Sequence, residues 1–222
     1  MNGNRPSAPA ARRVGIWFVS IIVLVVAGWL VYGFATAPNP PLSLSNDLNK
    51  TLPTDHVMGS GSTQLIEYSD FECPACKTYY TIVKQLNSDF AGKVTFIYRD
   101  FPLVSIHANA ARAAEAAEAA DLQGKFWEMH NKLFDGQDTW AAAKDPNPIF
   151  QQYAKDLGLN LDKFNSDINS SAMSDKIKAE ENEGNSIPIS GTPTFFLNGQ
   201  QVSNPGDYEN FKSILEKAVS AK

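Results

Sequence analysis

The amino-acid sequence predicts an α/β fold in which helices flank a mixed central sheet and a block of helices interrupts it. Three observations predict this fold. A strand runs directly into a helix, a second strand follows, and a hairpin with a closing helix comes only after a long helical stretch. Crossover helices that cover both faces of a sheet favour a mixed sheet.

The first strand–helix–strand unit spans residues 64–98. Residues 64–68 form a mainly apolar run that is typical of a buried strand. Residues 94–98 combine β-branched and aromatic side chains, which predicts the second strand. Between them, residues 77–90 carry apolar side chains at helical spacing, namely Tyr79, Ile82, Val83, Leu86 and Phe90.

Helices fill the middle of the chain. An alanine-rich helix is expected over residues 107–122, and a second helix over 125–134. Three shorter helices are expected over 149–157, 162–168 and 173–184. No repeat is visible in this block. Because it lies between the second and third predicted strands, it is expected to be a helical insertion in the fold.

A hairpin and a helix close the chain. Asn198-Gly199 is a hairpin turn signal between strands expected at 194–197 and 201–202. Residues 208–219 form an amphipathic pattern at helical spacing. We therefore expect the last strands to return to the sheet after the insertion.

The N-terminal segment is long and apolar enough to cross a membrane. Residues 14–34 contain no charged side chain and would span roughly 32 Å as a helix. Arg5, Arg12 and Arg13 precede it, so the positive-inside rule places the N-terminus in the cytoplasm and the remainder outside. Cleavage after Ala37 is an alternative, but the apolar run exceeds a signal-peptide core and favours an uncleaved anchor.

These patterns divide the chain into four parts. We expect a cytoplasmic N-terminus at 1–13, a transmembrane anchor at 14–35, a linker rich in Pro, Asn and Ser at 36–61, and an exported domain at 62–222. The helical insertion lies at about 105–186. After the three N-terminal arginines, 16 basic and 24 acidic residues remain, and this formal charge of −8 argues against nucleic-acid binding.

Both cysteines lie at the start of the helix expected over 77–90. Cys73 and Cys76 form a Cys-x-x-Cys pair, and Pro74 suits a first helical turn because its missing N–H would have no partner there. The free N–H groups and the dipole at a helix N-terminus stabilise a thiolate. A structural disulfide that closes so short a loop would gain little stability, so the pair predicts a redox dithiol in an exported chain.

The pattern does not favour a metal or a haem. One Cys-x-x-Cys pair supplies two of the four ligands of a structural zinc site, and His56, His107 and His130 are not at ligand spacing. Haem attachment would need a histidine after Cys76, where Lys77 stands. We therefore expect no metal and no cofactor, with His56 solvated in the linker, His107 at a helix start and His130 on a helix face.

Four segments, in the same order and spacing as in a known family, carry a resemblance. They are residues 67–76 (EYSDFECPAC), 98–103 (YRDFPL), 107–130 and 191–196 (GTPTFF). Over residues 62–222 the chain resembles the DsbA-like branch of the thioredoxin superfamily. These are exported thiol–disulfide oxidoreductases in which a helical domain interrupts the thioredoxin fold.

The resemblance implies a role for each of five residues. Cys73 is expected to be the exposed, attacking thiol, and Cys76 the buried, resolving thiol. Pro193 is expected to be a cis-proline facing them, with the backbone of Thr192 open to pair with an extended substrate segment. Glu67 is expected to lie buried beneath Cys76, with a raised pKa, and to take or return its proton through water.

One departure from the family bears on the direction of electron flow. Several strongly oxidising relatives have a histidine between the cysteines, where this chain has Pro74-Ala75. We therefore expect the pKa of Cys73 to be less depressed and the couple to be less oxidising. The turn acids Asp70 and Glu72 are expected to be solvated.

Together these inferences predict an enzyme: an exported, membrane-anchored protein thiol–disulfide oxidoreductase that forms disulfides in secreted proteins. By resemblance, its partners are reduced secreted proteins and a quinone-linked membrane enzyme that reoxidises the dithiol, either DsbB-like or vitamin-K-epoxide-reductase-like. Two alternatives stay open: a reductase or isomerase serving cytochrome or metal-centre maturation, and a non-catalytic binding or chaperone module. A reduction potential near −270 mV favours a reductase, and one near −120 mV an oxidase.

Overall fold

The computed structural model describes residue 48, residues 51–187 and residues 189–221. All of these residues belong to one compact unit, Leu42–Lys222. The expected cytoplasmic N-terminus at 1–13 and the expected anchor at 14–35 lie outside the described residues. Within the described part of the chain, no helix has the length and the apolar character needed to cross a membrane.

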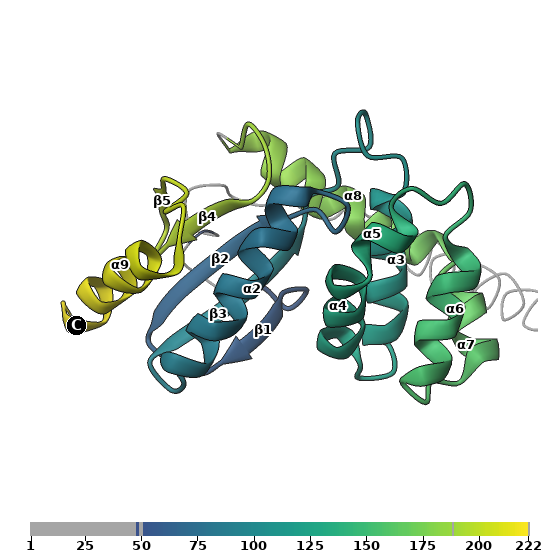
Figure 1. The fold of residues 1–222 in the computed structure, drawn as a ribbon, viewed down its shortest axis with the longest axis horizontal. Coiled ribbons are helices and arrows are strands. Elements are labelled where there is room, and N and C mark those ends of the chain that lie inside the picture. The colour runs from purple at the N-terminus through teal and green to yellow at the C-terminus, as the bar shows by residue number, and fades with distance from the viewer. Residues whose placement is uncertain (1–47, 49–50, 188, 222) are drawn as a thin grey trace, which may run out of the picture. The chain divides into compact units, whose positions relative to one another are not determined.

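A mixed five-stranded sheet, built from the described residues, forms the centre of the unit (Figure 1). The strand order is β1-β3-β2-β4-β5. Only the β2–β3 pair is parallel, whereas β1–β3, β2–β4 and β4–β5 are antiparallel, as expected for a mixed sheet. The strands are β1 His56–Gly59, β2 Thr63–Ser69, β3 Val94–Asp100, β4 Thr194–Leu197 and β5 Gln200–Val202.

Helices connect the strands and form the insertion. The first, α2, crosses from β2 to its parallel neighbour β3, and six helices then separate β3 from β4 (Figure 1). The short α5 was not expected from the sequence. The helices are α2 Pro74–Asp89, α3 Ala110–Asp121, α4 Phe126–Asp135, α5 Gln137–Trp140, α6 Asn147–Asp156, α7 Leu161–Asp167, α8 Ser171–Ser186 and α9 Tyr208–Ser220.

The folded unit begins earlier than the sequence predicts. The expected linker ran to residue 61, yet β1 pairs antiparallel with β3 along the edge of the sheet. His56, expected to be solvated, is only 5% exposed. Its ring stacks on Phe126 with centroids 3.3 Å apart, and its Nε2 lies 2.6 Å from Oε1 of Glu118. The prediction was wrong because these contacts come from the inserted helices, which no local pattern around His56 reveals.

The alternation of side chains along β2 divides the core into two layers. Leu65 packs with residues of α2 and α9 on one face of the sheet. Ile66 and Tyr68 pack on the opposite face with Phe101 of the loop after β3 and Phe196 of β4. Glu67 and Ser69 therefore share a face with Leu65, the face that α2 covers.

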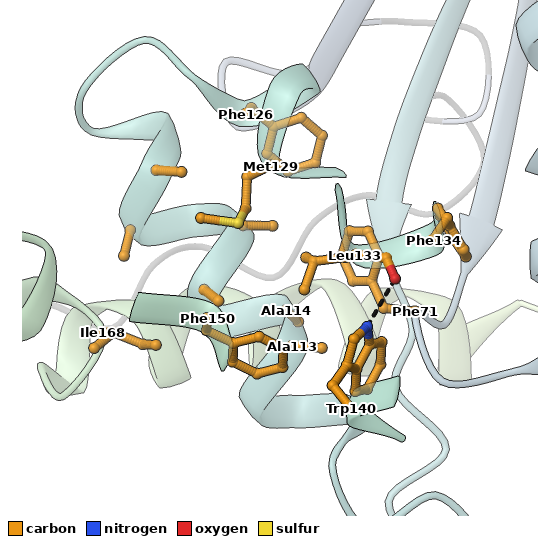
Figure 2. Close-up of a cluster of buried hydrophobic side chains, with 14 of the residues drawn as sticks. Phe71, Ala113, Ala114, Phe126, Met129, Leu133, Phe134, Trp140, Phe150 and Ile168 are labelled. Atoms are coloured by element: carbon orange, nitrogen blue, oxygen red, sulfur yellow. Dashed lines mark hydrogen bonds between the residues drawn. The ribbon is translucent and has the colours of Figure 1, made fainter. Parts of the chain in front are cut away.

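The insertion has a core of its own, which continues to the cysteine-bearing turn. Alanines on the buried side of α3 leave space for α4 and α6 (Figure 2). The indole Nε1 of Trp140 donates a hydrogen bond of 2.7 Å to the carbonyl of Leu133, which joins α5 to the end of α4. The same cluster includes Phe71, Cys73 and Cys76, so the inserted helices pack directly against the cysteine-bearing turn.

A buried arginine ties the start of the folded unit to β3 and α8. The Arg99 side chain is fully buried, with Nε 2.6 Å from Oδ1 of Asp55 and Nη1 2.8 Å from Oε1 of Glu183. Its Nη1 also donates to the hydroxyl of Tyr68 at 2.8 Å. Such buried charges are stable only while their partners stay in place.

Replacing Arg99 with Met should lower the free energy of unfolding by about 3–5 kcal/mol, because Asp55 and Glu183 would lose their buried cation. Urea unfolding followed by circular dichroism measures the change. As a control, Lys163→Met removes the exposed ion pair with Asp167 and should cost less than about 1 kcal/mol. Equal losses in the two variants would contradict a special role for Arg99.

Candidate active site

The two thiols occupy unequal positions at the start of α2. Cys73 is the residue before the first helical turn, with extended backbone angles (φ −69°, ψ 123°), and Pro74 takes the first helical position. Both cysteines are free thiols; Cys73 is 8% exposed and Cys76 is 0% exposed. Cys76 is therefore buried as the resemblance implies, whereas Cys73, expected to be exposed, is also buried and is only the more accessible of the two.

The electrostatics of the two thiols differ in the same sense. The hydrogen bond from the Cys76 thiol lowers the pKa of Cys73 to about 5, with a further contribution from the backbone N–H groups of Cys76 and Ala75. Burial raises the pKa of Cys76 well above its usual value, and the adjacent Cys73 adds to this shift. At neutral pH the pair therefore carries one thiolate on Cys73 and one proton on Cys76.

The loop before β4 faces Cys73. The Thr192–Pro193 peptide bond is cis, as the resemblance implied, and the Sγ of Cys73 lies 3.5 Å from the carbonyl oxygen of Thr192. Two hydrogen bonds fix this loop: Thr194 Oγ1 donates to the Gly191 carbonyl at 2.7 Å, and Asn204 Nδ2 donates to the Pro193 carbonyl at 3.0 Å. Because β4 pairs with β2, the sheet holds the loop beside the sulfur.

Glu67 lies on the buried face of β2 and is 7% exposed. Burial raises its pKa to about 7, while the nearby Ser69 side chain acts in the opposite direction. Glu67 also contributes to the electrostatic rise in the pKa of Cys76. The carboxyl group therefore acts electrostatically on the resolving thiol and changes its charge near neutral pH.

A cavity of about 250 Å³ opens between the sheet, α2 and α4, and Glu67 lines it. Two other buried residues that carry polar groups line it, Tyr98 and His130. Burial lowers the pKa of His130 to about 3, so this histidine is neutral. The sequence suggested only a helix-face position for His130, because its spacing on α4 says nothing of the cavity.

The turn acids are not solvated, which corrects the sequence prediction. Asp70 is 1% exposed, and its Oδ2 accepts hydrogen bonds from the Leu103 amide at 2.9 Å and lies 2.7 Å from Nδ1 of His107. The Oε2 of the partly buried Glu72 accepts from the amide of Asn109 at 2.6 Å. Both carboxylates thus anchor the turn to the segment that leads into α3. His107 lies in this segment, before the helix that begins at Ala110.

Gln137 is a further site residue that the sequence did not reveal. From the short α5, its Nε2 donates to the carbonyls of Phe71 at 2.6 Å and Cys73 at 3.0 Å. The side chain is buried, so the insertion fixes the backbone on both sides of Glu72. No motif signals this contact, since a four-residue helix leaves no periodic pattern.

Metal-binding side chains do not gather in the described part of the chain. No group of three or more His, Cys, Asp or Glu there could hold a metal ion. Buried His130 lies among the rings of Phe71, Tyr80 and Tyr98, and His56 bonds Glu118.

Comparison with known proteins gives one family match and several relatives. A family model described as Thioredoxin matches residues 51–217. A curated relative from Mycolicibacterium gilvum, named Na(+)/H(+) antiporter NhaA 1, is 30% identical over 95% of this chain but only 34% of its own length. The chain thus spans about a third of the first curated relatives that it matches. Probable disulfide bond formation protein D of Bacillus anthracis is 24% identical over 96% of this chain and 98% of that protein.

Solved structures share the arrangement of sheet and inserted helices. The crystal structure of alpha-DsbA1 from Wolbachia pipientis matches with a TM-score of 0.71 and 23% identity, covering 80% of this chain and 96% of that one. Oxidised BdbD from Bacillus subtilis matches with a TM-score of 0.68 and 22% identity, covering 78% and 96%. These likenesses explain the helical block as part of a shared fold. The resemblance inferred from the sequence is confirmed: the chain belongs to the thioredoxin family and has the fold of its DsbA-like members.

Proposed function

We propose that this protein is an exported, membrane-anchored thiol–disulfide oxidoreductase that forms disulfides in secreted proteins through the Cys73–Cys76 couple. The observation that carries the proposal is the inequality of the two thiols. Cys73 is partly accessible with a pKa of about 5, whereas Cys76 is fully buried with a raised pKa. Cys73 therefore exchanges with substrates, while Cys76 takes part only in making or breaking the Cys73–Cys76 bond.

The oxidative cycle needs only substrate thiols and the protein disulfide. A substrate thiolate attacks the Sγ of Cys73, the Cys73–Cys76 bond breaks, and Cys76 leaves as a thiolate that is then protonated. A second substrate thiolate attacks the substrate sulfur of the mixed disulfide, and Cys73 leaves as a thiolate. Two electrons pass from the substrate to the protein. The low pKa of Cys73 makes it a good leaving group in the second step.

The cis-proline loop supplies a docking edge for the substrate. The Thr192 carbonyl lies beside Cys73, and the loop continues directly into β4. An extended segment that pairs with this backbone would present its own cysteine to the Sγ of Cys73. Backbone pairing tolerates many side chains, which suits a protein that oxidises varied substrates.

Glu67 is the proposed acceptor and donor of the Cys76 proton. With a pKa of about 7, its carboxyl group can hold or release a proton near neutral pH. The adjoining cavity of about 250 Å³ has room for several waters, and its polar lining groups offer them partners. The proton can therefore leave the interior without passing the docked substrate.

The direction of electron flow is proposed from the Cys73 thiolate. Its pKa of about 5 lies between the values of roughly 7 for thioredoxin and 3.5 for DsbA. The name of the Bacillus anthracis relative, disulfide bond formation protein D, supports oxidation. We propose that reduced secreted proteins are the substrates and that a quinone-linked membrane enzyme, DsbB-like or vitamin-K-epoxide-reductase-like, reoxidises the dithiol.

The direct test is oxidation of a reduced, unfolded secreted protein by the oxidised chain. We expect stoichiometric disulfide formation, and a reduction potential between about −270 and −120 mV in glutathione buffers. The Cys73→Ser variant should lose exchange altogether. The Cys76→Ser variant, mixed with oxidised glutathione as the disulfide donor, should instead accumulate a mixed disulfide between Cys73 and glutathione, detectable by mass spectrometry. A chain that neither oxidises thiols nor reduces disulfides would refute the proposed function, and a potential at or below −270 mV would favour the reductase.

Replacing Glu67 with Gln should remove a pH dependence of stability. The pKa of Glu67 is about 7 in the folded state against 4.5 normally, so the folded state binds the extra proton between these pH values. The contribution of Glu67 to stability should therefore fall by about 3 kcal/mol as pH rises from 4.5 to 7, and the loss of stability in the variant should be smaller than in the parent protein by this amount. Urea unfolding at pH 4.5 and pH 8 gives both slopes.

The same Glu67→Gln variant should also slow exchange below pH 8, by about a hundredfold in the step that uses Cys76. The step that uses Cys73 alone should keep its rate. Unchanged rates for both steps across pH would restrict Glu67 to packing.

The proposed anchor is testable in cells. With residues 14–35 intact, the protein should fractionate with membranes and resist extraction by carbonate. A chain in which a cleavable signal peptide replaces residues 1–35 should be exported in soluble form with its exchange activity kept, since the folded unit matches the family model only from residue 51. An N-terminal sequence of the mature protein that begins at Pro38 would contradict the anchor.

A further inference from the structure

The cavity that Glu67 lines does not reach the sulfur of Cys76. Glu67 lines it, but Cys76 does not. Cys76 is fully buried, so its proton cannot leave directly to solvent. A group between the Cys76 thiol and the Glu67 carboxyl is therefore needed to carry the proton, or the two must meet directly.

Ser69 is the residue whose position suits a group between Glu67 and Cys76. It lies two residues after Glu67 on β2, so the alternation of the strand directs both side chains to the face that α2 covers. The next amide, that of Asp70, donates to the Sγ of Cys76 at 3.5 Å. The Ser69 carbonyl accepts from the Phe101 amide at 2.8 Å, which fixes the backbone at this point.

The hydroxyl of Ser69 is buried with no settled partner. Among the described residues, no group meets full hydrogen-bond geometry with its Oγ. Its strand position places it between the two groups, because Ser69 shares a face with Glu67 and the next amide reaches the Sγ of Cys76. In agreement with this placement, the Ser69 side chain lowers the pKa of Glu67 and that of Cys76. A buried hydroxyl without a fixed partner costs stability, and it is free to donate to whichever neighbour is ionised.

We propose that the Ser69 hydroxyl relays the proton between Cys76 and Glu67. When Cys76 resolves a mixed disulfide, Ser69 gives its hydroxyl proton to the Glu67 carboxylate and takes the thiol proton of Cys76. The products are a Cys76 thiolate, a neutral Glu67 and an unchanged hydroxyl. In the oxidative direction the transfers reverse, and the departing Cys76 thiolate receives the proton. The inference rests on the proposed exchange function.

Other titratable groups near the relay are poor acceptors. Asp100 lies opposite Ser69 in the β2–β3 register, but burial, with Glu118 and Glu180 nearby, raises its pKa and keeps its proton in place. Burial also raises the pKa of Tyr98, and it makes His130 neutral. The remaining titratable groups around the relay, among the described residues, are Cys73 just before α2, Cys76 on α2, Asp70 in the turn and Glu67 on β2.

The test separates the two steps of exchange in the full-length chain. The reduced protein is mixed with oxidised glutathione and quenched with acid at set times. The mixed disulfide on Cys73 forms in a first phase, and its resolution by Cys76 gives the second. We expect Ser69→Ala to slow the second phase by about tenfold or more at pH 6–7 while leaving the first unchanged. The difference should narrow towards pH 10, where hydroxide competes with the relay as the base that takes the Cys76 proton.

Matched variants distinguish a relay from a packing effect. Thr63 carries another buried hydroxyl without a partner among the described residues, on the same strand and face but at the far end of β2. Thr63→Val should leave both phases unchanged, and Ser69→Thr, which keeps the hydroxyl, should restore the second phase.

Each outcome decides a separate claim. A parent chain without either phase would refute the exchange function itself. Parent-like resolution in Ser69→Ala at pH 6–7 would overturn the relay alone. If Tyr98→Phe slowed resolution and Ser69→Ala did not, the relay would be assigned to Tyr98 instead. The hydroxyl of Tyr98 also lacks a partner within the described residues. A loss in Ser69→Ala that is the same at every pH would indicate a structural role and would also overturn the relay.

Discussion

The register of β2 with its two neighbours is the constraint on which the site depends. The parallel pairing with β3 places Glu67 opposite Tyr98 and Ser69 opposite Asp100, while the antiparallel pairing with β4 brings the Thr192–Pro193 loop alongside the same strand end. A slip of one residue would turn every β2 side chain to the other face. Backbone hydrogen bonds of the sheet therefore set the relative positions of Glu67, Ser69 and the cysteine-bearing turn.

The inserted helices complete the site as well as the core. The insertion supplies Gln137, which bonds the carbonyls of Phe71 and Cys73, and Asn109, whose amide holds Glu72. Its α4 provides one wall of the cavity that Glu67 lines. The turn is thus fixed from two independent directions, by the sheet and by the helical block. Such double support fixes the position of the Cys73 sulfur.

Local patterns in the sequence predicted most of the fold and the reactive centre. The dipeptide Asn198-Gly199 was sufficient to predict the hairpin turn, because these residue types readily adopt the left-handed backbone that the turn needs. In the structure their φ angles are 47° and 79°. The dithiol was evident since Cys73 and Cys76 precede a helix in the chain itself. By contrast, burial of His56 and Asp70 depends on partners from distant segments, Glu118 and the 103–107 loop. Ser69 gave no signal, because a serine in a strand is ordinary until its neighbours are known.

The N-terminal end of α2 links redox state to thermal stability. No side chain caps this helix by a hydrogen bond, and its first turn contains no acidic residue. The Cys73 thiolate therefore supplies the negative charge that interacts favourably with the positive end of the helix dipole. This thiolate exists only in the reduced protein. Oxidation removes that charge, so the reduced form should melt at a higher temperature than the oxidised form. By a thermodynamic cycle, the difference in folding free energy between the reduced and oxidised forms equals the amount by which folding shifts the reduction potential of the Cys73–Cys76 couple.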